Sequence, residues 1–195
     1  MAERGKERNF MDWLLQLDGN ILLWIQEHIR KEFLNPIVIF ISNLGNAGWF
    51  WLVLLALLVC IPMYRKTGMT GLIAVLIGFI ITNVFVKNLA ARIRPYEVVE
   101  GLRFIGTKPH DFSFPSGHST CSVAASAVLL AKLPKKAGIP LFVLGILICL
   151  SRLYVGVHYP TDVLAGAAIG LFAAFAALYL MKNKTGTNRQ KGTAA

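Results

Sequence analysis

The chain has 195 residues, of which 55% are hydrophobic and only 15% charged, and its mean hydropathy is +0.58. A soluble domain of this size cannot bury so much apolar surface, so the composition excludes an ordinary globular protein. The formal net charge is +10, and the basic residues lie mostly between and after apolar stretches. This favours the loops of a membrane protein over a nucleic-acid-binding patch. We therefore expect an all-α, polytopic membrane helix bundle with no nucleic-acid partner.

The first predicted element is an amphipathic helix over Phe10–Phe33. Charged residues interrupt apolar residues that recur at helical spacing; the apolar positions are Trp13, Leu14, Leu17, Ile21, Trp24, Ile25 and Ile29. Such a helix is better suited to lie at the membrane interface than to cross the bilayer. Residues 1–34 are therefore interpreted as a charged segment followed by an interfacial helix.

Residues 35–181 form the predicted membrane core. A helix needs roughly 17 to 25 apolar residues to cross a bilayer. The candidate spans, of which the third and fourth are short, are Ala47–Tyr64, Met69–Ala90, His118–Lys132, Ile139–Tyr154 and Pro160–Met181. A short apolar helix over Asn35–Leu44 precedes them and leaves a broken sixth crossing open, so we expect five to six spans. Residues 182–195 are expected to be a polar, disordered cytoplasmic tail.

Basic residues in the loops predict the orientation of the bundle. They fall on one side of a five-span arrangement, and outside the tail they are Arg65, Lys66, Lys132, Lys135 and Lys136. An excess of Lys and Arg is typical of cytoplasmic loops, so residues 87–115 and 154–159 are expected to face outward. An odd number of spans would also leave the basic N-terminus outside, and a sixth crossing would remove that conflict.

Three polar clusters lie at the outward ends of these spans. In the first, Lys87 and Arg94 are seven residues apart, so on a helix they would share one face until Pro95 ends it. Two cations on one face suit an anion. The alternative is that basic residues at a membrane boundary simply reach towards the lipid headgroups.

The second cluster is Phe114–Ser119. Ser116 is a suitable N-cap for the apolar helix that follows, Gly117 allows close approach to the backbone, and His118 falls in the first turn. Free N–H groups at a helix start bind phosphate oxygens well. An ordinary capped helix with an interfacial histidine is the alternative.

The third cluster is Ser151–Asp162. Arg152 is a charge in or near the membrane, which is costly and usually functional. His158 and Asp162 are four residues apart and would face each other if the last helix begins near His158. A carboxylate orients an imidazole and stabilises its charged form, as a nucleophile or base requires; a pair that only caps the helix is the alternative.

Together the clusters supply three cations, a helix N-terminus and two histidines, one of them with a carboxylate partner. This set fits phosphoryl transfer, in which catalysis is mostly positioning and charge stabilisation. The sequence lacks the carboxylate cluster that Mg²⁺ sites need, and only the two histidines could suggest Zn²⁺. We therefore expect no metal and no cofactor, and a covalent phosphohistidine intermediate.

The order K-x6-RP, PSGH and SR-x5-H-x3-D resembles the signature of the type 2 phosphatidic acid phosphatase superfamily, and every signature position matches. The resemblance implies that His158 is the nucleophile, Asp162 its orienting partner and His118 the general acid. It also implies a phosphate-binding set, which comprises Lys87, Arg94, Arg152, Ser116 and Gly117.

The motifs predict binding of a phosphate group but do not indicate the rest of the lipid. Small bacterial relatives of this layout resemble undecaprenyl-diphosphate and phosphatidylglycerophosphate phosphatases, so we expect undecaprenyl diphosphate first, and phosphatidylglycerophosphate or phosphatidate as the alternative. The expected location is a bacterial plasma membrane, with the site on the extracytoplasmic side. In the loop Tyr96–Ser113, the side chains that could touch a second phosphate, or simply be solvated, are Arg103, Lys108 and His110. A non-enzymatic lipid transporter is the competing class, and the oligomeric state is left open.

Overall fold

The computed structural model describes the backbone of residues 2–191 and the side chains of residues 12–182, and within them every regular element is a helix. The α-helices are α1 (Ala2–Trp24), α2 (Asn35–Leu44), α3 (Trp49–Cys60), α4 (Arg65–Phe79), α5 (Lys87–Ala90), α6 (Pro95–Val98), α7 (Gly117–Lys132), α8 (Lys135–Tyr154) and α9 (Pro160–Lys191). The shorter π and 3-10 segments are η1 (Ile25–Ile29), η2 (Glu32–Leu34), η3 (Asn46–Gly48) and η4 (Ile80–Val86). The predicted all-α bundle is confirmed.

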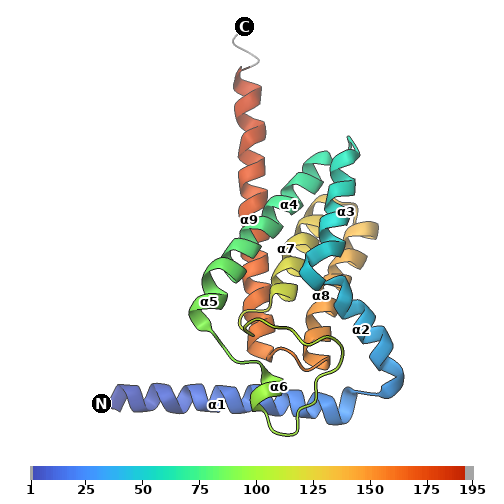
Figure 1. The fold of residues 1–195 in the computed structure, drawn as a ribbon. Helices are drawn as coiled ribbons and strands as arrows, with labels where there is room; N and C mark the ends of the chain where they lie inside the picture. The colour runs from blue at the N-terminus through green and yellow to red at the C-terminus, as the bar shows by residue number, and fades with distance from the viewer. Residues whose placement is uncertain (1, 192–195) are drawn as a thin grey trace.

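Helix α7 lies at the centre of the bundle, in contact with α4, α8 and α9 (Figure 1). Its 16 residues span about 24 Å, less than the roughly 30 Å of a hydrocarbon core. Small residues of α9 allow the two backbones to approach closely, since a Cβ at Gly170 would lie 2.7 Å from the carbonyl oxygen of Thr120. The short helix is therefore enclosed by its neighbours, and its first turn lies inside the bundle.

Three stretches of the described chain are long and apolar enough to cross a membrane, namely Arg65–Val98, Lys135–Tyr154 and Pro160–Lys182. Helices α2 and α3 add a fourth when they are taken as one span with a bend of 49°. The short helix predicted over Asn35–Leu44 is observed with these bounds as α2. The five predicted spans correspond, in chain order, to α3, the run from α4 to α5, α7, α8 and α9. Because α7 is too short for the same test, the number of crossings stays a prediction.

Helix α1 lies across one end of the bundle (Figure 1). Its apolar side chains Trp13, Leu17 and Trp24 are exposed, whereas Asp18 and Leu22 are buried against the bundle. One face of α1 thus contacts protein while an adjacent apolar face is free to contact lipid. This arrangement fits the predicted interfacial helix.

Both ends of the chain are more helical than predicted. Helix α1 begins at Ala2, before the expected start at Phe10, and α9 continues to Lys191 instead of ending near Met181. The expected disorder of the tail is wrong as far as Lys191, and residues 192–195 lie outside the described residues. Once a long helix has formed, each added residue fixes one more hydrogen bond at little cost, which explains the extension.

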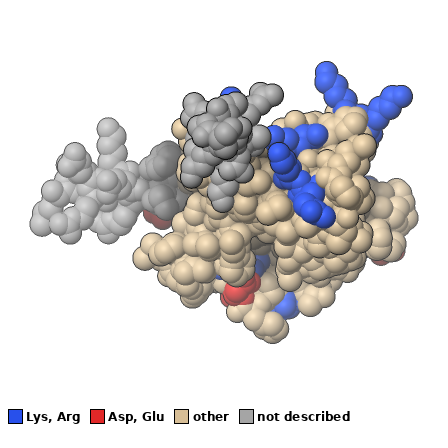
Figure 2. All heavy atoms as spheres, turned by 90° about the horizontal axis from the view of Figure 1, so that it is seen from above, with Lys and Arg blue, Asp and Glu red and all other residues tan. Residues whose placement is uncertain are grey.

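The basic loops gather at the end of the bundle opposite α1. The side chains there are exposed, and Figure 2, which looks down on this end, shows Lys and Arg upon it; they are Arg65, Lys66, Lys132, Lys135 and Lys136. The polar motifs lie at the other end, between the bundle and α1 (Figure 1). This is the charge asymmetry from which the orientation in the membrane was predicted.

Candidate functional site

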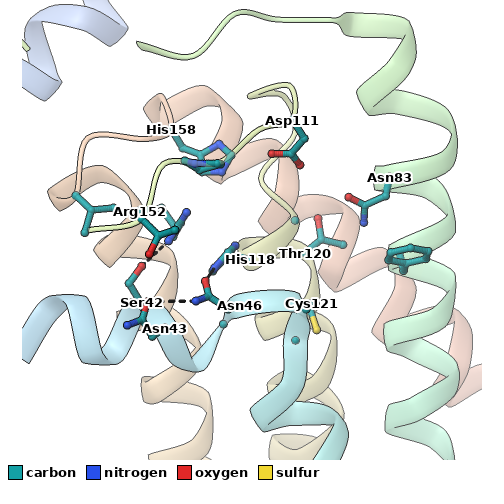
Figure 3. A pocket seen from close by; sticks show the side chains of 18 of the residues that line it. Ser42, Asn43, Asn46, Asn83, Asp111, His118, Thr120, Cys121, Arg152 and His158 are labelled. Atoms are coloured by element: carbon teal, nitrogen blue, oxygen red, sulfur yellow. Dashed lines mark hydrogen bonds between the residues drawn. The ribbon is translucent and has the colours of Figure 1, made fainter. Parts of the chain in front are cut away.

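A cavity of about 570 Å³ opens where the bend between α2 and α3, helix α7 and the loop before α7 meet. It brings together residues of all three motifs, which are Lys87, Arg94, Gly117, His118, Arg152 and His158. Figure 3 labels His118, Arg152 and His158 in this lining. The two remaining predicted residues, Ser116 and Asp162, are fully buried behind this lining. Segments far apart in the sequence thus converge on one polar pocket.

Lys87 and Arg94 both form salt bridges with the carboxylate of Asp111. The Nζ of Lys87 lies 2.5 Å from Oδ2 of Asp111, and Nη2 of Arg94 lies 2.5 Å from Oδ1. Partial burial alone would raise the pKa of Asp111, but the hydrogen bonds and charges of the two cations lower it to about 2. Because a carboxylate presents two oxygens much as a phosphate does, these contacts show that both cations point at one anion position.

Asp111 was not among the residues predicted from sequence. It lies in a loop without a regular pattern, four residues before Pro115. One signal was available, since two cations buried beside each other require a nearby anion to offset their desolvation.

The chain reaches Arg94 by a different path from the one predicted. Helix α5 ends at Ala90, and Ala91 has a left-handed backbone with φ of 43°. Arg94 is extended, with φ of −74° and ψ of 149°, as the residue before a proline prefers. The prediction that Lys87 and Arg94 share one helical face is therefore wrong, because the helix ends between them. They meet because the extended segment turns Arg94 back towards Asp111.

His158 lies between Arg94 and the buried carboxylate of Asp162. Its Nδ1 lies 3.4 Å from Oδ2 of Asp162, and its Nε2 lies 3.3 Å from Nη1 of Arg94. A carboxylate only accepts hydrogen bonds, so we assign the proton to Nδ1, which leaves the lone pair of Nε2 towards the cavity. Burial, more than any other influence, lowers the pKa of His158 to about 4. The imidazole is thus neutral near pH 7, the form that can act as a nucleophile.

Arg152 is the third cation and enters from α8. Its Nη1 donates to Oγ of Ser42 on α2 at 2.5 Å, and the side chain is almost fully buried. Its buried Nε has no hydrogen-bond partner among the residues that the structure describes. A buried donor left unpaired is costly, so the pocket holds donor capacity that a bound anion would use.

His118 is held by the bend between α2 and α3, which the sequence analysis treated only as a turn. Its Nε2 lies 3.0 Å from Oδ1 of Asn46 (Figure 3). The chain reverses there through Ala47, with φ of 49°, and Gly48, with φ of 67°. Gly45 lies against the imidazole, because a Cβ on it would be 2.6 Å from Cδ2 of His118. Gly45 and Asn46 are thus site residues that sequence reasoning missed, although two glycines between apolar helices signalled a close approach.

Ser116 caps α7, as predicted. Its Oγ accepts from the backbone N–H of Ser119 at 3.4 Å, and its own N–H donates to the carbonyl of Asp162 at 3.0 Å. Ser116 therefore joins the start of α7 to α9, while its neighbour Gly117 lines the cavity.

Of the three loop residues considered for a second phosphate, only Lys108 lines the cavity. Its Nζ lies 3.5 Å from Oε1 of Glu97 and 5.2 Å from the centre of the Tyr96 ring. Arg103 and His110 are exposed outside the lining. The structure therefore leaves Lys108 as the residue of this set that a bound diphosphate could contact.

The close contact at Gly45 predicts the effect of a single methyl group. Gly45→Ala should displace the imidazole of His118 and lower the expected phosphatase activity by about 10- to 100-fold, because small shifts of a reacting group are costly. Activity is measured as phosphate release by the purified protein, with thermal unfolding in parallel. Gly19→Ala is the matched control, since its Cβ would lie 3.4 Å from Val99, an ordinary contact. Full activity of Gly45→Ala would contradict the tight fit.

The salt bridges of Lys87 and Arg94 with Asp111 predict that replacing Asp111 changes the affinity for anions. Asp111→Asn removes the carboxylate that competes for Lys87 and Arg94. Because that carboxylate is half exposed, solvent weakens the ion pairs to about 1 kcal/mol, and inorganic phosphate should bind about fivefold more tightly. Isothermal titration of phosphate into the purified protein measures this, with His110→Asn as the neighbouring control. Weaker binding in Asp111→Asn would mean that Asp111 supports the anion instead of competing with it.

Comparison with known proteins gives concordant results. A sequence profile described as the PAP2 superfamily matches residues 68–186. An undecaprenyl-diphosphatase of Sulfolobus acidocaldarius is 34% identical over 142 residues, which cover 73% of this chain and 68% of that protein. Phosphatidylglycerophosphatase B of Bacillus subtilis is 33% identical over 165 residues, which cover 75% of each protein.

One solved structure extends the similarity to the fold. It is the crystal structure of a transmembrane PAP2-type phosphatidylglycerolphosphate phosphatase from Bacillus subtilis, with a TM-score of 0.68 and 25% identity. The similarity covers 90% of this chain and 88% of that one. Profile, relatives and fold agree with the three motifs and confirm the resemblance noted in the sequence: the chain belongs to the PAP2 superfamily.

Proposed function

We propose that the protein is an integral membrane phosphatase that hydrolyses a lipid phosphate or diphosphate, with undecaprenyl diphosphate as the first candidate substrate. The observation that carries this proposal is the composition of the cavity. Its polar part holds cations and histidines, whereas its other part is lined by apolar side chains of α3 and α4, including Leu52, Leu72, Leu76 and Phe79. Leu76 and Phe79 are also exposed. A lipid could thus place its phosphate among the cations and its hydrocarbon chain along an apolar path to the bilayer.

The first half of the proposed reaction transfers the phosphoryl group to the enzyme. Lys87, Arg94 and Arg152 bind the phosphoryl oxygens after the phosphate has displaced Asp111. The lone pair of His158 Nε2 then forms a bond to phosphorus while the bond from phosphorus to the leaving oxygen breaks. Asp162 stabilises the positive charge that develops on the imidazole. His118 enters this step as an imidazolium, donates its proton to the leaving oxygen and becomes neutral.

The second half releases phosphate. Water attacks phosphorus, the N–P bond breaks, and His118 takes a proton from the water, so both histidines return to their starting states. The three cations hold the charge of the phosphoryl group throughout, which is where most of the catalysis of such a transfer arises. This scheme uses no metal and no cofactor.

Three observations bear on the substrate and on the side of the membrane that the site faces. The two relatives described above are named for undecaprenyl diphosphate and for phosphatidylglycerophosphate, so both lipids are candidates. Lys108 lines the cavity and could meet the second phosphate of a diphosphate. The basic loops at the opposite end favour the cytoplasm, so the site would face the extracytoplasmic side of a bacterial plasma membrane.

A lipid panel tests the proposal. Purified protein in detergent should release phosphate from undecaprenyl diphosphate, and more slowly from phosphatidylglycerophosphate or phosphatidate. His158→Ala should lower the rate at least about 1,000-fold, because it removes the nucleophile. His110→Ala, which changes an exposed loop histidine, is the control for a histidine substitution. A wild-type protein that releases no phosphate from any of these lipids would favour a non-enzymatic transporter.

The absence of a metal step is tested separately. Because arginine and lysine side chains supply the charge in this scheme, phosphate release should stay within about twofold of its initial rate after dialysis against EDTA. The rate is measured on undecaprenyl diphosphate before and after dialysis. Loss of activity that added Mg²⁺ or Zn²⁺ restores would overturn the proposed chemistry.

A further inference from the structure

Arg92 lies beside the catalytic motifs but outside the set that the motifs predict. Its Nη1 donates to Oδ1 of Asp162 at 2.7 Å and to Oγ1 of Thr161 at 2.7 Å. Its Nη2 donates to Oδ2 of Asp18 at 2.8 Å, and its guanidinium carbon lies 3.8 Å from the centre of the Tyr159 ring. One guanidinium thus joins the buried carboxylate behind the nucleophile to a carboxylate on α1.

The two oxygens of Asp162 have separate partners. Oδ1 accepts from Arg92, whereas Oδ2 accepts from the N–H of Tyr159 at 2.9 Å and from the hydroxyl of Ser113, and faces Nδ1 of His158. An imidazole that must become positively charged needs the charge of Oδ2 and a fixed direction to it. Keeping Arg92 on Oδ1 preserves the charge of Oδ2 and its fixed direction towards the imidazole.

Asp18 is buried on the face of α1 that contacts the bundle, with 2% of its surface exposed. Besides Arg92, it accepts from the N–H of Thr161 at 3.2 Å and from the hydroxyl of the same residue. A carboxylate is rarely buried to this extent unless it is paired. Two carboxylates therefore share one guanidinium, and Asp162 does not have to neutralise Arg92 alone.

We propose that Asp18 is a positioning residue for the His158–Asp162 pair, acting from the interfacial helix through Arg92. By holding one side of the guanidinium, Asp18 keeps Arg92 on Oδ1 of Asp162 and leaves Oδ2 to the histidine. Without it, Arg92 is free to draw more of the Asp162 charge and to move towards Oδ2. This inference rests on the proposed function, because it assigns His158 as the nucleophile.

Leu22 of α1 and Gln26 of η1 attach this helical segment to the bundle independently of Asp18, so an effect of Asp18 on catalysis can be separated from loss of docking. Leu22 packs in a buried cluster with Leu102 and Tyr159. Gln26 donates to the carbonyl of Gly101 at 3.0 Å and accepts from the N–H of Arg103 at 2.7 Å. Loss of the Asp18 carboxylate therefore leaves these contacts in place.

The test is Asp18→Asn in the full-length protein in detergent, with undecaprenyl diphosphate as substrate. We expect kcat to fall about 10- to 100-fold, the usual effect of removing a group that orients a reacting side chain. KM, and inhibition by inorganic phosphate, should stay within about twofold, because the three phosphate-binding cations are unchanged. Asp12→Asn, which makes the same chemical change at an exposed position of α1, should behave as wild type.

A double-mutant cycle separates positioning from a merely structural role. In an Arg92→Gln background, Asp18→Asn should have little further effect on kcat, because the charge that Asp18 restrains is gone. If Asp18 only anchored α1, its loss would have the same effect in both backgrounds.

The outcomes are distinct. A wild-type protein without phosphatase activity overturns the proposed function, whereas an active protein whose kcat is unchanged by Asp18→Asn overturns this inference alone. Equal losses in both backgrounds also overturn it. If Asp18→Asn does not fold, Arg92→Lys decides, because a single ammonium cannot bridge two carboxylates as the forked guanidinium does. The inference then requires the same loss in kcat with KM unchanged.

Discussion

Three buried cations at one end of an apolar bundle are the constraint on which the rest of the structure depends. Moving a charge out of water costs several kcal/mol unless a partner offsets it, and lipid-facing helices offer few partners. Asp111 offsets two of these charges, whereas Arg152 contacts only the neutral hydroxyl of Ser42 among the described contacts and leaves its Nε unpaired. The pocket is thus built around an anion, and the phosphoryl group of a substrate supplies a better one than a carboxylate.

The proposed nucleophile, His158, and the proposed acid, His118, are held by different parts of the chain. His158 depends on Asp162, which is surrounded by donors from the loop before α7 and from Arg92. His118 depends on Asn46 and on the space that Gly45 leaves open. Because each imidazole is fixed by its own neighbours, the two rings can keep a set geometry towards one phosphate between them.

The N-terminal helix, which is expected to lie at the membrane interface, contacts the network behind His158. One face of α1 presents exposed apolar side chains, while Asp18 on another face contacts Arg92. An interfacial helix is usually regarded as an anchor. Helix α1 also supplies a buried carboxylate to the network behind the proposed nucleophile, so the proposed catalytic pair and α1 are joined by one network of hydrogen bonds.

Local sequence patterns were sufficient to predict much of the structure of this protein. The apolar runs predicted the positions of the helices because a bilayer demands long apolar segments whatever the tertiary fold. Three motifs with fixed internal spacing predicted which residues meet, since Lys87, Arg94, His118, Arg152 and His158 all line one cavity. The cap at Ser116 followed from its own neighbours along the chain.

Contacts between distant segments could not be predicted in this way. The pairing of Asp111 with Lys87 and Arg94 depends on how an irregular loop folds back. The contact of Gly45 with His118 and the bridge from Asp18 through Arg92 to Asp162 depend on where helices cross. Periodicity reports the environment of each residue along its own helix. A contact between distant segments is set by packing, so local signals can suggest that a residue needs a partner but do not identify that partner.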